Sequence, residues 1–588
     1  MFNNYAALKQ TNGDAYLSLL YGLRMDASMS AYLTLPIGLF VFLSIFLPFF
    51  KKYQSYFYFT IILLLPILLI LFADAELFKA WGNHIDVTPL KYLSNPKAAW
   101  ASIAHLPITL IFIGFILLYL LLYFFFKRWI KLGVVVLKTT QQKWLSAITL
   151  LILTAAFIIP LRGGLQLSPI NQSSVYFSKH SFSNQAAINV VWNFMSSVIT
   201  NRNDVNNPFK VVSKKEAQQT LDSLFVTSKA KEGIWLKQSG NKKPNVLIIV
   251  WESFTAKAVE WKKGSSNITP GFNQLINEGI YFDSIYATGD RTDKGIVGIL
   301  SGYPAQPTTS IVKEPTKAAK LPMLSKTFKA IKYHTAFFYG GELEFANMKA
   351  YLVQGEFDQL ISVKDFKDKD LNSKWGAHDG VVADTLQRYL QQTHTPFFTT
   401  WLTLSSHEPF EIPTKPLFPG TLDEDAYLSS LHYTDEVVYQ FIQQAKQQSW
   451  WANTIVVITG DHGHRIPASK HRWEDFRTPL LFLGGALSQT NIRISEVGSQ
   501  TDIAATLLAQ LNIISTPFTW SKNMLASKYK PNAYFSFNNG FGWVVPPQKF
   551  IYDNVGLLIV DSIGSVPKNV VFAGRKLQQA AFQDYLDK

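Results

Sequence analysis

Two segments that lie far apart in the chain carry side chains suited to bind a divalent cation. Glu252 comes two residues after the end of the apolar run 246–250, and Asp461 and His462 come shortly after the apolar run 454–458. Both runs are rich in Val and Ile, as buried parallel strands usually are. Ligands bind beyond the carboxyl ends of the strands in open α/β sheets, so we expect the three side chains to converge there. Two carboxylates and one imidazole suit Mn²⁺, Mg²⁺ or Zn²⁺. The sequence therefore predicts one metal site.

A third segment, 289–295, contains Thr292 between a strand-like run at 281–286 and a predicted helix at 293–301. The free N–H groups and the dipole of a helix N-terminus favour phosphate at this point. Thr292 has two interpretations. It could only cap the helix, or a neighbouring metal could lower the pKa of its hydroxyl and make it a nucleophile.

A fourth segment, 404–410, places His407 directly after a predicted strand. Its imidazole could bind a phosphate oxygen or protonate a leaving group. A single His at the end of a strand is more often structural, so both interpretations stay open.

Basic side chains follow the second metal segment. His464 and Arg465 are the nearest to the predicted ligands, and Lys470, His471 and Arg472 come next. Such a cluster could bind phosphate oxygens or lipid headgroups. It could equally be a solvated loop.

The composition indicates a membrane portion. Hydrophobic residues make up 48% of the 588 residues and charged residues only 16%, against about 25% charged in soluble proteins. Four apolar runs approach the length of a spanning helix; they are 31–50, 56–73, 106–126 and 144–160. The net charge of +14 comes from scattered Lys and Arg, which argues against nucleic-acid binding and fits anionic lipid headgroups. Without Cys there is no disulfide and no thiolate ligand.

The distribution of charge predicts the orientation. Basic residues lie between the first two runs and between the last two, while acidic residues mark the loop between the second and third. Basic loops face the cytoplasm, so everything after residue 161 should lie outside a bacterial cytoplasmic membrane. The first 30 residues would then lie outside too, which implies either a weak extra span at 15–23 or a missing upstream helix. We favour the missing helix. Asp74 and Glu76 could be a functional intramembrane pair or simple interfacial residues.

The chain divides into four predicted parts: a membrane bundle at 1–161, a juxtamembrane connector at 162–243, a catalytic domain at 244–535 and a C-terminal antiparallel β appendage at 536–588. Strands alternate with helices in the catalytic domain, which predicts an α/β fold with a mixed, mainly parallel sheet between helices. The expected strands are 245–251, 281–286, 334–339, 397–404, 454–459 and 479–483, and the expected helices are 215–228, 270–278, 293–301, 322–331, 378–391, 428–447 and 501–511.

Glu252, Thr292, the Asp461-His462 pair and the Ser-x-His-x-Pro-Phe segment at His407 resemble the extracellular domain of the lipoteichoic acid synthase family. That family belongs to the alkaline phosphatase/sulfatase superfamily. The resemblance implies that Thr292 is both nucleophile and metal ligand, and that His407 contacts substrate. It also implies that phosphoglycerol is taken from a phosphatidylglycerol lipid and passed, through a phosphoglyceryl-threonine, to an acceptor hydroxyl. The expected cofactor is one divalent ion, Mn²⁺ first and Mg²⁺ or Zn²⁺ otherwise.

The chain departs from the family pattern in the headgroup region. Tyr339, Ala346 and Met348 stand where the polymer-making synthases have His, Trp and Arg. Loss of the Arg removes a bidentate phosphate contact, so the headgroup stays open between phosphatidylglycerol and phosphatidylethanolamine. Glu342 or Glu344 could bind a positively charged ethanolamine, or both could be solvated surface residues.

Other functions remain for comparison. A phosphoethanolamine transferase would differ only in the headgroup, whereas a non-catalytic envelope scaffold would merely keep the fold. A sulfatase is disfavoured because its nucleophile is an oxidised Cys or Ser, and a free phosphatase because it needs a second set of metal ligands. The acceptor should be an envelope glycan or lipid.

Overall fold

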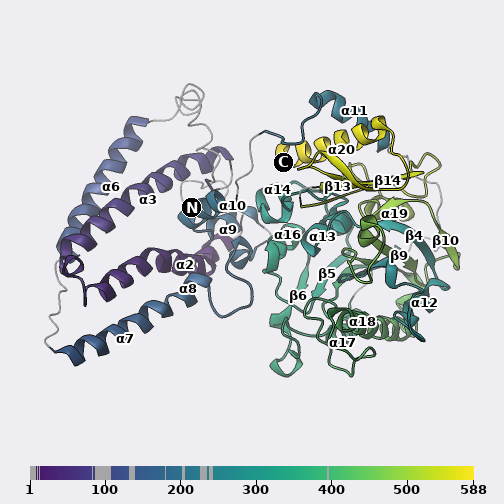
Figure 1. The fold of residues 1–588 in the computed structure, drawn as a ribbon, viewed down its shortest axis with the longest axis horizontal. Coiled ribbons are helices and arrows are strands. Elements are labelled where there is room, and N and C mark those ends of the chain that lie inside the picture. The colour runs from purple at the N-terminus through teal and green to yellow at the C-terminus, as the bar shows by residue number, and fades with distance from the viewer. Residues whose placement is uncertain are drawn as a thin grey trace. The chain divides into compact units, whose positions relative to one another are not determined.

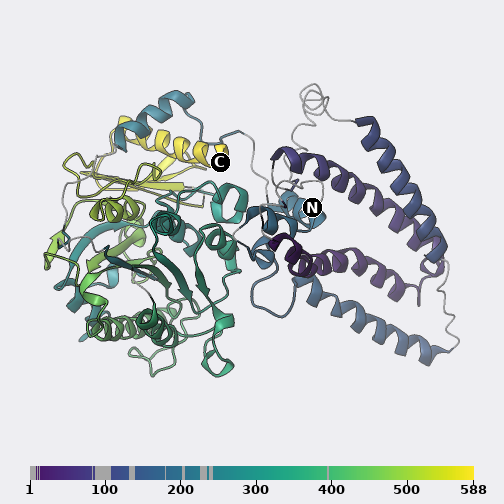
Figure 2. The same ribbon diagram turned by 180° about the vertical axis from the view of Figure 1, so that it is seen from behind.

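The structure is a computed structural model that describes residues 8, 11, 13–81, 84–85, 108–130, 139–178, 180–200, 206–225, 235–237, 243–393, 396–538 and 540–588. The chain forms two compact units, 1–205 and 206–588, whose elements are drawn in Figures 1 and 2. Asp86, Lys131 and Lys138, which contributed to the predicted orientation, lie outside the described residues.

Among the described residues of the first unit, four helices are long and apolar enough to cross a membrane, as the composition predicts; the fourth counts α7 together with the short helix α8 (Ile158–Arg162) that follows it. They are α2 (Asp14–Leu43), α3 (Tyr53–Trp81), α6 (Ile108–Trp129) and α7 (Thr140–Ala156). Helices α2 and α7 contact each other, and so do α3 and α6 (Figure 1). Many of their large apolar side chains are exposed, as expected of surfaces that face lipid. These helices fit a bacterial membrane protein.

The first predicted span is shifted in the structure. Helix α2 begins at Asp14, so residues 15–23 belong to this helix and are not a separate span. It ends at Leu43 rather than residue 50, and a short 3₁₀-helix, η2 (Pro48–Lys51), follows. Leu47 is extended, because the proline ring after it disfavours helical backbone.

Asp74, near the C-terminal end of α3, is buried and takes part in a hydrogen-bond network. Its carboxylate accepts hydrogen bonds from the Ile85 backbone N–H at 2.7 Å and contacts Nδ1 of His84 at 2.8 Å. Nε2 of His84 lies 2.8 Å from the carbonyl oxygen of Gln185 in α9 (Ser181–Ala186). These contacts join three segments, which favours the structural interpretation of Asp74.

A nine-stranded sheet forms the centre of the second unit, with the order β10-β4-β9-β8-β1-β7-β5-β6 and β11 beside β4. The strands are β1 (Asn245–Trp251), β4 (Ile280–Tyr286), β5 (His334–Tyr339), β6 (Gln359–Ile361), β7 (Phe397–Leu402), β8 (Thr454–Gly460), β9 (Arg477–Leu483), β10 (Ile492–Ile494) and β11 (Gly498–Ser499). Strand β9 is antiparallel to β8 and β4, whereas every other pair is parallel. This confirms the mixed, mainly parallel sheet.

Helices cover both faces of this sheet (Figures 1 and 2). All seven residues of β1 are buried, and successive side chains enter two different apolar cores. One core includes α13 (Thr292–Ser301), α15 (Leu324–Ala330), α16 (Met348–Gln354) and α19 (Asp502–Gln510). The other includes α12 (Pro270–Ile276), α17 (Asp379–Gln392) and α18 (Asp423–Ala445). A strand buried on both faces explains the uninterrupted apolar run in the sequence.

The C-terminal appendage is a four-stranded antiparallel sheet, as predicted. Its strands are β12 (Ala533–Phe537), β13 (Gly540–Val545), β14 (Gln548–Asp553) and β15 (Leu558–Ser562). The sequence interpretation missed the final helix, α20 (Lys568–Asp587), which packs against α11 (Lys214–Leu224). Its buried Leu577, Ala581 and Tyr585 recur every four residues, so the helical signal was present in the sequence.

The remaining elements are short. They are α8 (Ile158–Arg162), α10 (Val190–Thr200), α14 (Pro315–Ala318), β2 (Lys262–Lys263), β3 (Ser266–Asn267), η4 (Gln172–Val175), η5 (Ala256–Ala258), η6 (Ile311–Lys313), η7 (Phe345–Asn347), η8 (Val363–Asp365), η9 (Asp368–Asp370), η10 (Trp451–Asn453) and η11 (Arg472–Phe476).

Asp435 of α18 connects two covering helices and gives the fold a pH dependence. Its carboxylate accepts hydrogen bonds from the backbone N–H groups of Gly271 and Phe272, at 2.6 and 2.7 Å. Burial raises the pKa of Asp435 from 3.8 to about 7. The folded state therefore keeps a proton that the unfolded state loses, and the contribution of Asp435 to stability falls as pH rises from about 4 to about 7.

The variant Asp435→Asn removes this titration. We expect the melting temperature of the natural chain, relative to the variant, to fall as pH rises through this window. Thermal unfolding of the purified chain at several pH values measures the difference. Parallel pH profiles for the two proteins would show that Asp435 does not titrate in this window.

Candidate metal centre

Glu252, Asp461 and His462 offer ligand atoms that all lie within 4.8 Å of one another. Strands β1 and β8 are parallel, with Trp251 opposite Gly460, so the residues that follow them meet at one edge of the sheet. Nε2 of His462 lies 3.6 Å from an oxygen of each carboxylate. Atoms at that separation could both bind a single ion at about 2.1 Å.

The ring nitrogen of His462 and the carboxylate oxygen of Asp461 that face away from the cluster make hydrogen bonds, and these bonds orient the two side chains. Nδ1 of His462 lies 2.7 Å from the carbonyl oxygen of Gly463, which leaves Nε2 to face the carboxylates. Oδ1 of Asp461 accepts hydrogen bonds from the backbone N–H groups of Ser253 and His462, both at 2.7 Å. Oδ2 of Asp461 is buried and has no hydrogen-bond partner among the described residues. A buried carboxylate oxygen requires a partner, and a divalent cation at this point would be one.

The electrostatics of the cluster also fit a cation. Burial, and next the charge of Glu252, raises the pKa of Asp461 to about 7. Burial alone would lower the pKa of His462, but the two carboxylates raise it overall. Negative charge is thus concentrated where little water can stabilise it, and a bound cation would neutralise that charge.

Thr292 is the first residue of α13, and its hydroxyl donates a 3.2 Å hydrogen bond to Oε2 of Glu252. The cap position is occupied by Arg291, whose side chain makes no capping hydrogen bond. Thr292 therefore does not cap the helix, and its hydroxyl lies beside the cluster. A Cβ added at Gly295 would lie 1.9 Å from the carbonyl oxygen of Asp461, so α13 packs directly against the loop that carries this ligand.

Ser253 connects the two halves of the cluster. Besides its N–H bond to Asp461, its hydroxyl donates to Oε1 of Glu252 at 2.8 Å, and its carbonyl accepts from the Tyr427 hydroxyl at 2.6 Å. Its φ of 56° is unfavourable for a residue with a side chain. These three hydrogen bonds offset the strain of a turn that places Glu252 and Asp461 together.

Gln500 holds the loop that carries Asp461 and His462, called the ligand loop below. The sequence analysis did not identify this residue. Its amide nitrogen donates to the carbonyl oxygens of Gly460 and Asp461, at 2.8 and 2.7 Å. Its amide oxygen accepts from the N–H of Thr288 at 3.2 Å. Gln500 lies in none of the chemical motifs of the sequence, so only the tertiary contacts reveal it.

His407 lies in an aromatic environment. Its ring centroid is 4.7 Å from that of Trp375 and 6.3 Å from that of Phe345, and Nδ1 lies 2.9 Å from the carbonyl oxygen of Glu408. Within the described part of the chain, no hydrogen bond or ion pair joins it to the metal cluster. Neither aromatic neighbour could be inferred from the sequence, because Phe345 and Trp375 are distant from His407 in the chain.

Asp379, at the start of α17, anchors the segment before His407. Its buried carboxylate accepts hydrogen bonds from the N–H groups of Leu404 and Ser405, at 2.7 and 3.1 Å, and from the Thr434 hydroxyl at 2.7 Å. The carboxylate of Asp379 therefore holds the segment that leads from β7 to His407 in place.

The basic segment after the ligands does not form one patch. His464 stacks on Tyr427 with ring centroids 4.0 Å apart, and burial together with nearby positive charges lowers its pKa to about 3. Arg465 is exposed. His471 contacts Asp561 of β15 at 3.0 Å, and the guanidinium of Arg472 lies 3.9 Å from the ring centre of Phe537 in β12. His464 is thus a neutral imidazole near the ligands, whereas His471 and Arg472 connect this segment to the C-terminal sheet.

Two residues of the region predicted to bind the headgroup, Tyr339 and Glu344, are buried. Tyr339 is buried, and burial with the charges of Glu252 and Asp461 raises the pKa of its hydroxyl. Glu344 is only 7% exposed and pairs with Lys349 and Lys364. Burial raises the pKa of Glu344, but the two lysines lower it by more. Glu344 is therefore not a solvated surface residue, and its charge is already balanced.

Comparisons with known proteins find a matching family model and several relatives of this chain. Residues 244–513 match the family model described as Sulfatase. The chain is 24% identical over 294 residues to a lipoteichoic acid synthase-like protein of Bacillus subtilis, covering 46% of this chain and 47% of the relative. It is 22% identical over 497 residues to lipoteichoic acid synthase of Staphylococcus saprophyticus, covering 81% and 74%. It is 23% identical over 321 residues to phosphoglycerol transferase I of Xanthomonas campestris, covering 50% and 45%. The chain spans about half the length of the first of these relatives.

Solved structures show the same fold. An alkaline phosphatase superfamily protein of Vibrio parahaemolyticus superposes with a TM-score of 0.56 at 21% identity, covering 65% of this chain and 98% of the other. The lipoteichoic acid synthase LtaP of Listeria monocytogenes superposes with a TM-score of 0.51 at 19% identity, covering 64% and 99%. The family match therefore identifies a sulfatase-type domain at residues 244–513, and the solved structures show that the same fold occurs in these two proteins.

Proposed function

We propose that this protein is a membrane-anchored, metal-dependent phosphotransferase. It moves phosphoglycerol, or a similar phospho-headgroup, from a membrane phospholipid to an acceptor hydroxyl of an envelope glycan or lipid. The observation that carries the proposal is the Thr292 hydroxyl, 3.2 Å from a carboxylate of the candidate metal cluster. The relatives named lipoteichoic acid synthase and phosphoglycerol transferase support the reaction class.

Glu252, Asp461, His462 and Thr292 would bind one divalent ion, with Mn²⁺ the first expectation and Mg²⁺ or Zn²⁺ the alternatives. Three oxygen ligands and one nitrogen ligand are compatible with each of these. When bound, the ion supplies charge stabilisation for the phosphoryl oxygens and favours the alkoxide form of the hydroxyl.

The side chains then define a two-step transfer. The Thr292 oxygen attacks phosphorus, a threonine O–P bond forms and the lipid O–P bond breaks. The oxygen of diacylglycerol gains one proton, which balances the proton that the Thr292 hydroxyl gives up. The acceptor hydroxyl attacks the same phosphorus in the second step, loses its proton and restores Thr292. Oε2 of Glu252 accepts the hydroxyl hydrogen bond of Thr292, so the proton of the nucleophile faces a carboxylate before attack. His464, as a neutral imidazole, and Arg465 are the proposed substrate contacts near the ligands.

His407 is the proposed contact for the leaving or accepting group. Its ring lies beside Trp375 and Phe345, which offer apolar surface to the carbon atoms of a headgroup or acceptor. Phosphoglycerol remains the favoured headgroup, because Glu344 is already paired with two lysines and offers no uncompensated charge to ethanolamine. Transfer takes place outside the cytoplasmic membrane if the basic loops face the cytoplasm.

The first test replaces the nucleophile. Thr292→Ala should lower the transfer of headgroup label from phosphatidylglycerol by roughly 10³-fold or more, because the covalent step is lost. Thr292→Ser keeps a hydroxyl and should retain measurable transfer. Equal melting temperatures would show that both variants are folded. Unchanged transfer by Thr292→Ala would remove the mechanism.

The second test identifies the headgroup. The chain is incubated separately with headgroup-labelled phosphatidylglycerol and phosphatidylethanolamine, quenched in acid, digested and analysed by mass spectrometry. We expect a phosphoglycerol adduct on the peptide that contains Thr292. A phosphoethanolamine adduct would instead support the alternative transferase, and label on a different residue would contradict the assigned nucleophile.

The third test separates an enzyme from a scaffold that keeps the fold. The purified chain should contain about one divalent ion, and Glu252→Gln or Asp461→Asn should lower this occupancy strongly, because each removes a charged ligand. Glu260→Gln is the matched control, since Glu260 is exposed and pairs with Arg493. Elemental analysis after dialysis gives the stoichiometry. A natural chain that binds no Mn²⁺, Mg²⁺ or Zn²⁺ would favour the scaffold.

A further inference from the structure

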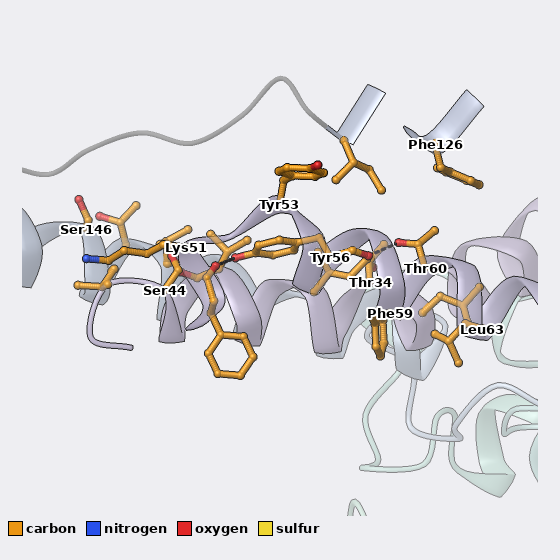
Figure 3. A pocket seen from close by; sticks show the side chains of 18 of the residues that line it. Thr34, Ser44, Lys51, Tyr53, Tyr56, Phe59, Thr60, Leu63, Phe126 and Ser146 are labelled. Atoms are coloured by element: carbon orange, nitrogen blue, oxygen red, sulfur yellow. Dashed lines mark hydrogen bonds between the residues drawn. The ribbon is translucent and has the colours of Figure 1, made fainter. Parts of the chain in front are cut away.

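A cavity of about 1110 Å³ lies between the four long helices of the first unit. It is lined by the second half of α2, the first half of α3, the end of α6 and the start of α7. Figure 3 shows Ser44, Lys51 and Ser146 towards one end and Thr60 and Leu63 towards the other. The volume exceeds the usual range of small-molecule clefts, roughly 300–1,000 Å³. None of its residues belongs to the candidate metal centre.

The walls of this cavity are hydrocarbon in character. Most of the lining side chains are Leu, Ile, Val or Phe. The hydroxyls of Thr34, Thr60 and Thr149 donate hydrogen bonds to carbonyls of their own helices, at 2.7, 2.8 and 2.9 Å. These hydroxyls are therefore satisfied and require no polar ligand. Such walls suit an occupant made largely of alkyl chain.

Lys51 and Lys143 are the two charged residues that line the cavity, one from η2 and the other from the first turn of α7. Within the described part of the chain, neither ammonium group pairs with a carboxylate. Two positive charges at the rim of an apolar cavity complement a phosphate attached to long alkyl chains. Basic pockets between membrane helices are a known form of site for anionic lipid headgroups.

We propose that this cavity binds one anionic membrane phospholipid. The acyl chains lie between the pair α2/α7 and the pair α3/α6, and the phosphate lies between Lys51 and Lys143. The lipid comes from the leaflet that borders the basic segments, because both lysines lie at that end of the helices. This resident lipid fills the gap between two helix pairs and is separate from the transferase reaction, so failure of either proposal leaves the other intact.

The first experiment tests the charge. The full chain in detergent is stripped of lipid and titrated with phosphatidylglycerol or phosphatidylcholine, and native mass spectrometry counts the bound lipid. Phosphatidylglycerol should bind more tightly than phosphatidylcholine. Lys51→Gln and Lys143→Gln should each weaken its binding about fivefold. Lys52→Gln is the matched control, because Lys52 is exposed and does not line the cavity. Equal affinity of the natural chain for the two lipids, or equal losses in all three variants, would overturn the proposal.

The second experiment tests the site of the acyl chains. Leu63→Trp fills the end of the cavity away from the lysines, whereas Ile62→Trp adds the same ring at a neighbouring position that is 69% exposed. We expect Leu63→Trp to reduce phosphatidylglycerol binding and to abolish the rise in melting temperature that this lipid causes, while Ile62→Trp preserves both. Melting temperatures without lipid check that each variant is folded. Unchanged lipid binding by a folded Leu63→Trp variant would overturn the placement of the chains.

Discussion

The parallel pairing of β1 with β8 is the constraint on which the candidate site depends. With Trp251 opposite Gly460, the next residue of each strand enters the same space, and two carboxylates meet in a buried environment. Burial, and next the neighbouring charge of Glu252, raises the pKa of Asp461 to about 7. Hydrogen bonds and the nearby imidazole of His462 offset part of this charge, and the proposed cation would offset the rest.

The surrounding structure supplies the hydrogen bonds. Ser253 joins Glu252 to Asp461 across the two strands, and Gln500 holds the carbonyl oxygens of the ligand loop. Helix α13 approaches this loop so closely that position 295 must be glycine. That close packing sets the position of Thr292, because the helix cannot move away without leaving an empty space in a buried core. Thr292, the proposed nucleophile, is thus positioned by packing as much as by its own hydrogen bond.

The membrane unit follows a different physical rule. Its helices expose apolar side chains on the outside, and they diverge enough to leave a large cavity inside. Water would be a poor occupant of a cavity with hydrocarbon walls. The acyl chains of a phospholipid would contact those walls, and its phosphate would pair with the two lysines. Asp74 differs from the two lysines, because both oxygens of its carboxylate already have partners in His84 and the backbone N–H of Ile85.

The sequence by itself determined the fold class, the four apolar helices and the identity of Glu252, Asp461 and His462 as a cluster. These are local signals: an apolar run predicts a buried strand, and parallel strands bring their carboxyl ends to one edge. Only the tertiary structure shows that Thr292 is not the helix cap and that its hydroxyl lies beside Glu252, because the residue type at a helix end does not reveal its neighbours. It also decided that Glu344 is paired, that His464 is neutral and that Gln500 supports the ligand loop. Burial and pairing depend on neighbours far away in the chain, and no local pattern of residues encodes them.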